Sequence, residues 1–278
     1  MQTNSLYITE GGNAIKGSNR IPAEMSMSIY NQAVSMLKLS YPDIECLPLG
    51  STGRKGRGET NGDIDIGVAL PWEEHTKILR LLKNSITSYY TNEGAHILSV
   101  GIHFSDGGTR FGVAQVDLMF SNNLALTAFA LNSPYSADSA WKGVIRNLLF
   151  YACVHQVETQ HDNEMFETGE LKHQWKTIFS SIQGLVLREL DYVGVNGNAL
   201  KQGKKIGDKI ISDMPGDIVK IVLGPLATTA DCYSAERLWE FVHSPKYSRP
   251  DRTADIEREF FDSIAKFAIT KDDFLATV

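Results

Sequence analysis

The sequence predicts an α+β protein, with a mixed β-sheet flanked by helices in its first half and a mainly helical second half. Two observations support this fold class. In residues 1–132, short apolar runs bounded by glycine, proline or polar residues alternate with helix-like segments. Beyond residue 133, longer segments with apolar residues at helical spacing dominate. We therefore expect two domains, residues 1–132 and 133–278, divided at the Asn132-Ser133-Pro134 break.

The elements of the first half follow from this pattern. Residues 1–20 are polar and glycine-rich, which fits a loosely held arm or an arm folded over a bound nucleotide. Pro22 opens an amphipathic helix that ends at Tyr41-Pro42. The remaining elements are predicted as strands over 44–49, 63–70, 95–104 and 111–120, and as a helix over 71–89. Asp106-Gly107-Gly108 predicts a tight turn between the last two strands.

The second half is less regular. Helices are predicted over 121–131, 139–158, 217–223, 234–242 and 251–267. Residues 174–195 fit either a helix or a hairpin, and we favour strands. Residues 196–209 predict a turn-rich loop whose lysines fit a solvated surface or an acceptor groove, namely Lys201, Lys204, Lys205 and Lys209. The last residues are expected to fray.

Composition narrows the class of protein. The 278 residues are 42% hydrophobic and 22% charged, as in an ordinary globular protein with a full core. A net charge of −6 argues against sequence-independent coating of nucleic acid, although it permits a local basic groove. The three cysteines are scattered singly, so we expect reduced thiols and neither a zinc site nor disulfides. Without a membrane-length apolar run or a signal-peptide core, a soluble cytoplasmic protein with no membrane partner is expected.

The stretch from Leu49 to Val68 has the clearest chemical pattern. A short apolar run leads into a Gly-Ser turn and a basic glycine-rich loop, and Asp63 and Asp65 then lie in a second apolar run. Carboxylates two residues apart on a strand point to the same face, where their like charges repel. A hard divalent cation is the usual compensation. Asp117 lies in another apolar run, so either a metal compensates it or that face of its strand is wet.

This arrangement resembles the signature of the polymerase-β-like nucleotidyltransferase superfamily. That signature is Gly-Ser, then Asp-h-Asp-h, where h is an apolar residue, and a third carboxylate on a later strand. Gly50-Ser51, Asp63-Ile64-Asp65-Ile66 and Asp117 match its three parts in order. The resemblance covers residues 44–120, and a helical second half is similar to that of poly(A) polymerases, tRNA-end-adding enzymes and oligonucleotide cyclases. The early Gly-Gly-Asn together with Gly50-Ser51 and the loop after it also looks like nucleotidyltransferases of tailed phages.

The resemblance implies transfer of a nucleoside monophosphate from an NTP, with ATP the first choice, to an acceptor hydroxyl. Asp63, Asp65 and Asp117 would be the catalytic residues and would hold two Mg²⁺ or Mn²⁺ ions. The remaining binding residues would hold the triphosphate, through the turn or through positive charge: Gly50, Ser51, Thr52, Arg54, Lys55, Lys142 and Arg146. The last two share a helix face that fits a solvated surface equally well. The loop is also more basic than a Gly-Ser turn requires, which fits contact with the triphosphate or with an acceptor phosphate.

Several acceptors and two other classes of protein remain open. An RNA 3′ end, such as that of tRNA, is the first choice, with the loop carrying Lys201 to Lys209 in the acceptor groove. A small molecule or a protein hydroxyl comes next, followed by a second nucleotide that would give an oligonucleotide or a cyclic dinucleotide. A glycosyltransferase also uses an Asp-x-Asp motif, but it leaves Gly50-Ser51 and Asp117 unexplained. A catalytically silent nucleotide-binding module is the non-enzymatic alternative, and the presence of all three acids argues against it.

Overall fold

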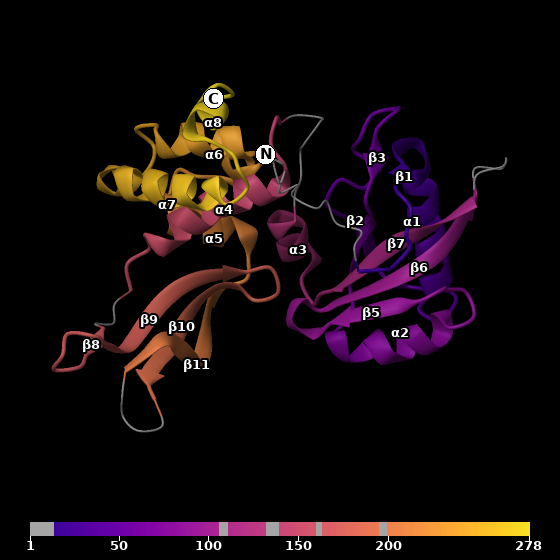
Figure 1. The fold of residues 1–278 in the computed structure, drawn as a ribbon, viewed down its shortest axis with the longest axis horizontal. Coiled ribbons are helices and arrows are strands. Elements are labelled where there is room, and N and C mark those ends of the chain that lie inside the picture. The colour runs from indigo at the N-terminus through magenta and orange to yellow at the C-terminus, as the bar shows by residue number, and fades with distance from the viewer. Residues whose placement is uncertain (1–13, 106–110, 132–138, 160–162, 195–198) are drawn as a thin grey trace, which may run out of the picture. The chain divides into compact units, whose positions relative to one another are not determined.

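A computed structural model describes residues 14–105, 111–131, 139–159, 163–194 and 199–278 (Figure 1). Contacts divide the chain into two units, Met1–Val144 and Ile145–Val278. The domain boundary predicted at residues 132–133 lies outside the described residues, as does the turn predicted at 106–108. Both units combine helices with strands, which confirms the α+β class. Among the described residues, no helix has the length and apolar character needed to span a membrane.

The first unit contains a mixed five-stranded sheet (Figure 1). In spatial order its strands are β2 (Cys46–Pro48), β4 (Ile64–Val68), β7 (Phe111–Phe120), β6 (Ile97–Ser105) and β5 (Tyr89–Asn92). The central pair β4 and β7 is parallel, whereas the other neighbouring pairs are antiparallel. A separate two-stranded ribbon joins β1 (Ile21–Pro22) to β3 (Thr60–Asn61).

Two helices, one after β1 and one after β4, pack on one face of this sheet. The helical elements of the first unit are α1 (Ala23–Lys38), the 3₁₀ turn η1 (Trp72–Glu74), α2 (His75–Leu82), a second 3₁₀ turn η2 (Glu93–Ala95) and α3 (Leu124–Ala130). Apolar side chains of α1 and α2 form one core with Ile64, Ile66 and Val68 of β4, which are fully buried. Because side chains alternate along a strand, Asp65 belongs to the opposite face. That opposite face carries the candidate site.

One helix of the first unit is shorter than predicted. The pattern over 71–89 predicts a helix, but α2 ends at Leu82 and Tyr89 begins the edge strand β5, which pairs with β6. The intervening residues 83–88 include Asn84, Ser85 and Thr87, whose polar side chains compete with the helical backbone for hydrogen bonds. The prediction is therefore wrong over residues 83–89.

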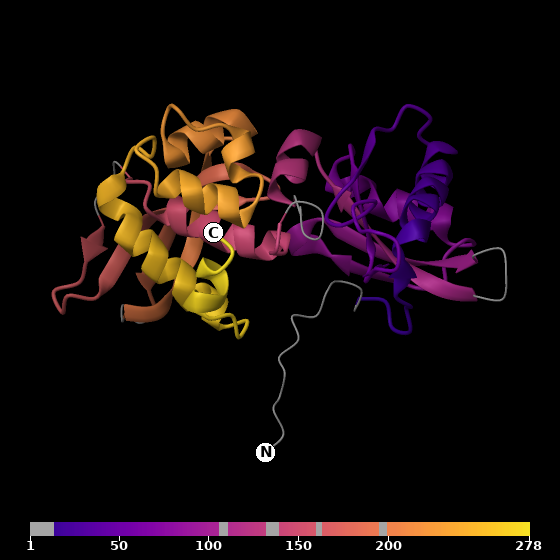
Figure 2. The same ribbon diagram turned by 90° about the horizontal axis from the view of Figure 1, so that it is seen from above.

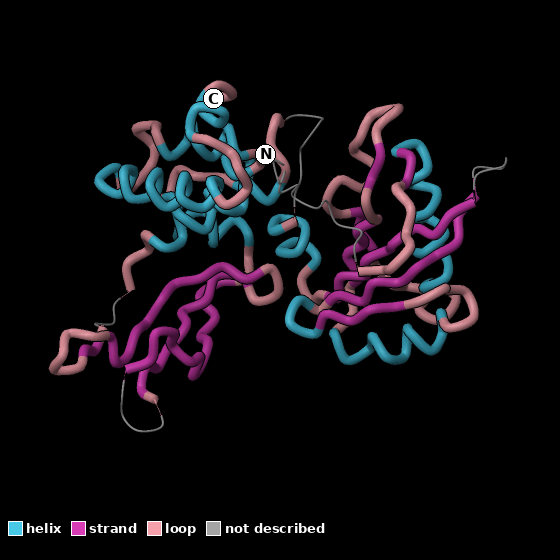
Figure 3. The backbone as a smooth tube through the Cα atoms, viewed as in Figure 1, coloured by secondary structure: helices cyan, strands magenta, loops and turns pink. Residues whose placement is uncertain are grey.

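The second unit places helices beside an antiparallel sheet (Figure 3). The sheet has the order β11 (Ala199–Ser212), β10 (Gly184–Val193), β9 (Leu171–Ser180) and β8 (Glu164–Met165). The helices are α4 (Gly143–His155), α5 (Pro215–Leu223), α6 (Ala235–Val242), α7 (Thr253–Ala265) and α8 (Lys271–Leu275), with 3₁₀ turns at η3 (Thr229–Cys232) and η4 (Pro250–Arg252). Figure 2 shows these helices, coloured from pink through orange to yellow, gathered together.

The helices predicted over 139–158, 217–223, 234–242 and 251–267 are confirmed as α4 to α7, whereas the loop predicted over 196–209 is wrong. Residues 174–195 form strands, as favoured from the sequence. The loop predicted over 196–209 is instead part of β11 from residue 199 onward, so this unit is less helical than predicted. One edge of β10 supplies backbone hydrogen-bond partners to β11, so this segment forms a strand although its composition is typical of turns. Lysines are common on edge strands such as β11. The short helix α8 begins at a capping box formed by Thr270 and Asp273, and its Phe274 is fully buried.

Candidate metal centre

Three carboxylates converge on the face of the first sheet opposite α1 and α2. The parallel register of β4 and β7 sets Asp65 directly beside Asp117, and Asp63 lies two residues before Asp65. One carboxylate oxygen from each residue lies within 4.8 Å of the other two. The structure therefore brings together the three acids that the sequence predicts as one cluster.

Burial and mutual repulsion disfavour the charged forms of these acids. The pKa of Asp65 is raised well above its usual value, first by burial and then by the charges of Asp63 and Asp117. Burial also raises the pKa of Asp117, although hydrogen bonds from Ser99 and Gln115 partly offset this effect. A divalent cation would stabilise all three carboxylates, and oxygen ligands suit Mg²⁺ or Mn²⁺. The donor set therefore fits the metal that the sequence predicts.

Gln115 holds the third carboxylate in place. Its Nε2 donates to Oδ1 of Asp117 at 3.0 Å and to Oδ2 at 3.1 Å. Its Oε1 accepts a hydrogen bond from the backbone N–H of Ile15 at 2.9 Å, which fixes the orientation of the amide. Gln115 is only 2% exposed. Gln115 was not among the residues predicted from the sequence, although its position two residues before Asp117 on one strand is a signal that could have identified it.

The described part of the N-terminal arm is fastened to the same strand. The backbone N–H of Asn19 donates to the carbonyl of Val113 at 2.8 Å, and its Oδ1 accepts from the N–H of Val113 at 2.9 Å. Ile15 is buried, with 3% of its side chain exposed. Residues 14–20 are therefore not loosely held, whereas residues 1–13 of the predicted arm lie outside the described residues.

The Gly-Ser turn packs closely against Asp65. Gly50 adopts a φ of +55°, and a Cβ atom at this position would overlap Oδ2 of Asp65, so only glycine fits without distortion. Thr52 Oγ1 accepts a hydrogen bond from the backbone N–H of Asp65 at 3.0 Å. Ser51 Oγ donates to Oδ1 of Asn61 at 3.0 Å. The turn that the sequence predicts to hold phosphate therefore lies directly beside the acidic cluster.

The predicted basic residues occupy different surroundings. Arg54 is exposed in the loop after the turn, and Lys55 is half-buried with its Nζ donating to the carbonyl of Thr60 at 2.8 Å. Lys142 is half-buried just before α4. Arg146 lies on α4 with 1% of its side chain exposed, and burial lowers its pKa to about 10. The expectation of a solvated helix face is therefore wrong for Arg146, which is buried in the structure.

Comparison with known proteins adds no relative. The sequence matches no profile of a known protein family, and no curated protein sequence matches it. The chemistry of this centre therefore rests on the side chains and distances given above.

Proposed function

We propose that the protein is a metal-dependent nucleotidyltransferase that moves a nucleoside monophosphate from an NTP, with ATP the first choice, to an acceptor hydroxyl. The observation that carries this proposal is the convergence of Asp63, Asp65 and Asp117 within 4.8 Å, beside a glycine turn that contacts Asp65. Carboxylate clusters of this kind suit two-metal phosphoryl transfer. The resemblance to the polymerase-β-like signature supports the same reaction.

The three carboxylates would hold the metal ions in this proposal, and one of them would also take part in proton transfer. Asp63, Asp65 and Asp117 would hold two Mg²⁺ or Mn²⁺ ions, which supply positive charge to the triphosphate and make the acceptor hydroxyl more acidic. Asp117 would help to take the acceptor's proton, because a hydroxyl beside a divalent cation loses its proton more readily. Gln115 and Ser99 hold that carboxylate in one orientation.

The turn and its loop bind the triphosphate. The Ser51 hydroxyl would exchange its hydrogen bond to Asn61 for one to a phosphate oxygen. The backbone N–H of Thr52 is not a phosphate donor, because it donates to the carbonyl of Leu49 at 3.0 Å, so the other N–H groups of the turn would supply the remaining bonds. No side chain of Gly50 obstructs the approach of phosphate. Arg54 and Lys55 follow in the same loop and supply positive charge to the leaving pyrophosphate.

An RNA 3′ end is our first choice of acceptor. The lysines of β11 support it, because Lys201, Lys204 and Lys209 are exposed and form no ion pair with any described residue. Lys205 is less available, since it pairs with Asp208 at 2.6 Å. A small molecule, a protein hydroxyl or a second nucleotide are the alternative acceptors.

The decisive experiment incubates the protein with each α-labelled NTP and Mg²⁺ or Mn²⁺, with and without total RNA, and resolves RNA from small products. Label on RNA supports the first-choice acceptor, and label in a small product supports a small-molecule or cyclase-like reaction. A double variant with Asp63→Asn and Asp65→Asn is the matched control and should give no labelled product. Metal-dependent NTP binding without label in RNA, protein or small products would refute transfer and favour a silent nucleotide-binding module.

A further inference from the structure

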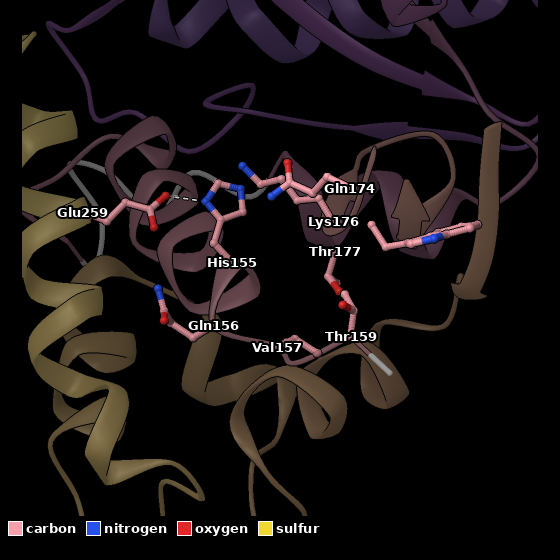
Figure 4. A pocket seen from close by; sticks show the side chains of 9 residues that line it. His155, Gln156, Val157, Thr159, Gln174, Lys176, Thr177 and Glu259 are labelled. Carbon is pink, nitrogen blue, oxygen red and sulfur yellow. Dashed lines mark hydrogen bonds and ion pairs between the residues drawn. The ribbon is translucent and has the colours of Figure 1, made fainter. Parts of the chain in front are cut away.

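The second unit contains a cavity of about 370 Å³ (Figure 4). It is lined by His155 at the end of α4, by Gln174 and Lys176 of β9, and by Glu259 of α7. All of these residues belong to the second unit, so the cavity does not depend on the position of the metal centre. Its volume is within the range of small-ligand sites.

Two polar side chains that line this cavity, those of His155 and Gln174, are each oriented by a hydrogen bond to a neighbouring side chain. Nδ1 of His155 bonds to Oε1 of Glu259, which leaves Nε2 of the imidazole for a ligand. Tyr192 donates its hydroxyl hydrogen to Oε1 of Gln174 at 3.0 Å, which leaves the amide Nε2 for a ligand. Figure 4 shows the side chains of Gln174 and Lys176 pointing toward His155. The amide Nε2 of Gln174 can therefore donate a hydrogen bond to a ligand, and Nε2 of His155 can do so when the ring carries both protons.

The sheet beside this cavity carries surplus positive charge. Lys176 is half-buried, and it forms no ion pair with any residue in the described part of the chain. On the neighbouring strand Arg188 lies directly opposite Lys176. Arg188 and Lys205 share the carboxylate of Asp208, at 2.8 and 2.6 Å. Those two cations lower the pKa of Asp208 to about 2, and Lys176 is left without an anion.

We propose that this cavity binds the phosphate group of a nucleotide or of a nucleic-acid strand, held by Lys176, His155 and Gln174. A phosphate carries several acceptor oxygens and up to two negative charges, which match a group of donors with an uncompensated ammonium. Glu259 is the only carboxylate among the described residues that line the cavity, and it is engaged by His155. When the ring of His155 carries both protons, its Nε2 is also a donor. The cavity is larger than one phosphate, so it leaves room for the rest of a nucleotide.

The test measures binding without the metal centre. The full chain with Asp63→Asn and Asp65→Asn, in EDTA, is titrated by calorimetry with pyrophosphate, with ATP and with a short single-stranded RNA. Adding Lys176→Gln should weaken binding by at least about tenfold, as expected for a lost charge-assisted hydrogen bond. The matched control is Lys172→Gln, which removes the same charge from the same strand, where Lys172 pairs with Glu164 at 3.4 Å. This control should change affinity by less than about twofold, as expected for an exposed ion pair.

The outcomes separate the sources of phosphate and can overturn the proposal. Binding of pyrophosphate or ATP that depends on Lys176 identifies a small phosphate ligand, and dependence seen only with RNA identifies a nucleic-acid backbone. The parent for these comparisons is the chain that carries Asp63→Asn and Asp65→Asn. If neither Lys176→Gln nor His155→Asn changes the affinity of this parent for any probe, the proposal is overturned. Equal losses from Lys176→Gln and Lys172→Gln, or no binding of any probe by the parent, also overturn it. Circular dichroism melting of each variant verifies that the fold is retained, and neither result depends on catalytic turnover.

Discussion

Replacing Asp65 with asparagine should stabilise the metal-free protein while it removes a metal ligand. One oxygen of each carboxylate lies within 4.8 Å of an oxygen of the other two. Two unit charges at that separation repel by about 3.5 kcal/mol at an effective dielectric constant near 20. Solvent reaches Asp63 and Asp65, which are half-buried, so the screened penalty is about 1–3 kcal/mol. Asp65→Asn removes this repulsion and nearly preserves the shape of the side chain. We expect the melting temperature in EDTA at pH 7.5 to rise by roughly 3–8 °C.

The pH dependence of this gain follows from the raised pKa of Asp65. The folded state binds more protons than the unfolded state at pH values between the usual pKa of 3.8 and the raised one. The stability contributed by this residue therefore falls as the pH rises through that window, and the penalty is complete above the raised pKa. The advantage of Asp65→Asn should consequently be larger at pH 7.5 than at pH 5 and should disappear below about pH 4.

Calorimetric or circular dichroism melting measures both effects. Asp43→Asn is the control, because Asp43 is exposed in the same unit and should leave the melting temperature unchanged. Mg²⁺ should stabilise the parent more than Asp65→Asn, since the variant lacks one ligand. A lower melting temperature for Asp65→Asn in EDTA at pH 7.5, or an equal gain at pH 4, would refute the argument that these carboxylates repel.

Four further predictions concern the same unit and the basic strand. Asp63→Ala should abolish transfer of labelled nucleotide while it preserves the melting transition, and retained turnover would contradict the metal assignment. Gln115→Leu should lower kcat by about tenfold or more with little change in KM for NTP, because it releases the third carboxylate; an equal effect on KM would argue for a merely structural role, and Gln115→Asn, which keeps an amide donor, tests for partial rescue. Gly50→Ala should cost about 1–3 kcal/mol in unfolding free energy, because a side chain is strained at φ +55° and meets a carboxylate; chemical denaturation measures this loss, and an unchanged value would show that the turn can move. Lys204→Glu with Lys209→Glu should weaken RNA binding in gel-shift assays and leave NTP binding unchanged, and unaltered RNA affinity would remove β11 from the acceptor site.

The first unit follows closely from its sequence because its strands are apolar runs with strong boundaries. The run predicted over 111–120 is β7, and the parallel pairing of β7 with β4 produces the expected cluster of acids. A pattern of alternating residues fixes which face is buried, so it also fixes that Asp65 and Asp117 share the other face. Local sequence therefore determines the acidic cluster once the strands pair.

The features that the sequence did not reveal depend on partners distant in the chain. β11 exists because β10 offers an edge to it, which no local property of the lysine-rich segment indicates. The role of Gln115 depends on contacts with both Ile15 and Asp117. The burial of Arg146 likewise depends on tertiary packing. Its spacing from Lys142 indicated only that the two basic side chains share one face of a helix.

The parallel pairing of β4 with β7 has a consequence for the order of folding. Asp65 and Asp117 lie far apart in the sequence, and the antiparallel hairpin of β6 and β7 is local, so closing the parallel pair is the entropically slower event. A cation held by both residues would therefore report when this pair closes. Added Mg²⁺ should speed folding if the pair is formed in the transition state for folding, and it should slow only unfolding if the pair forms afterwards.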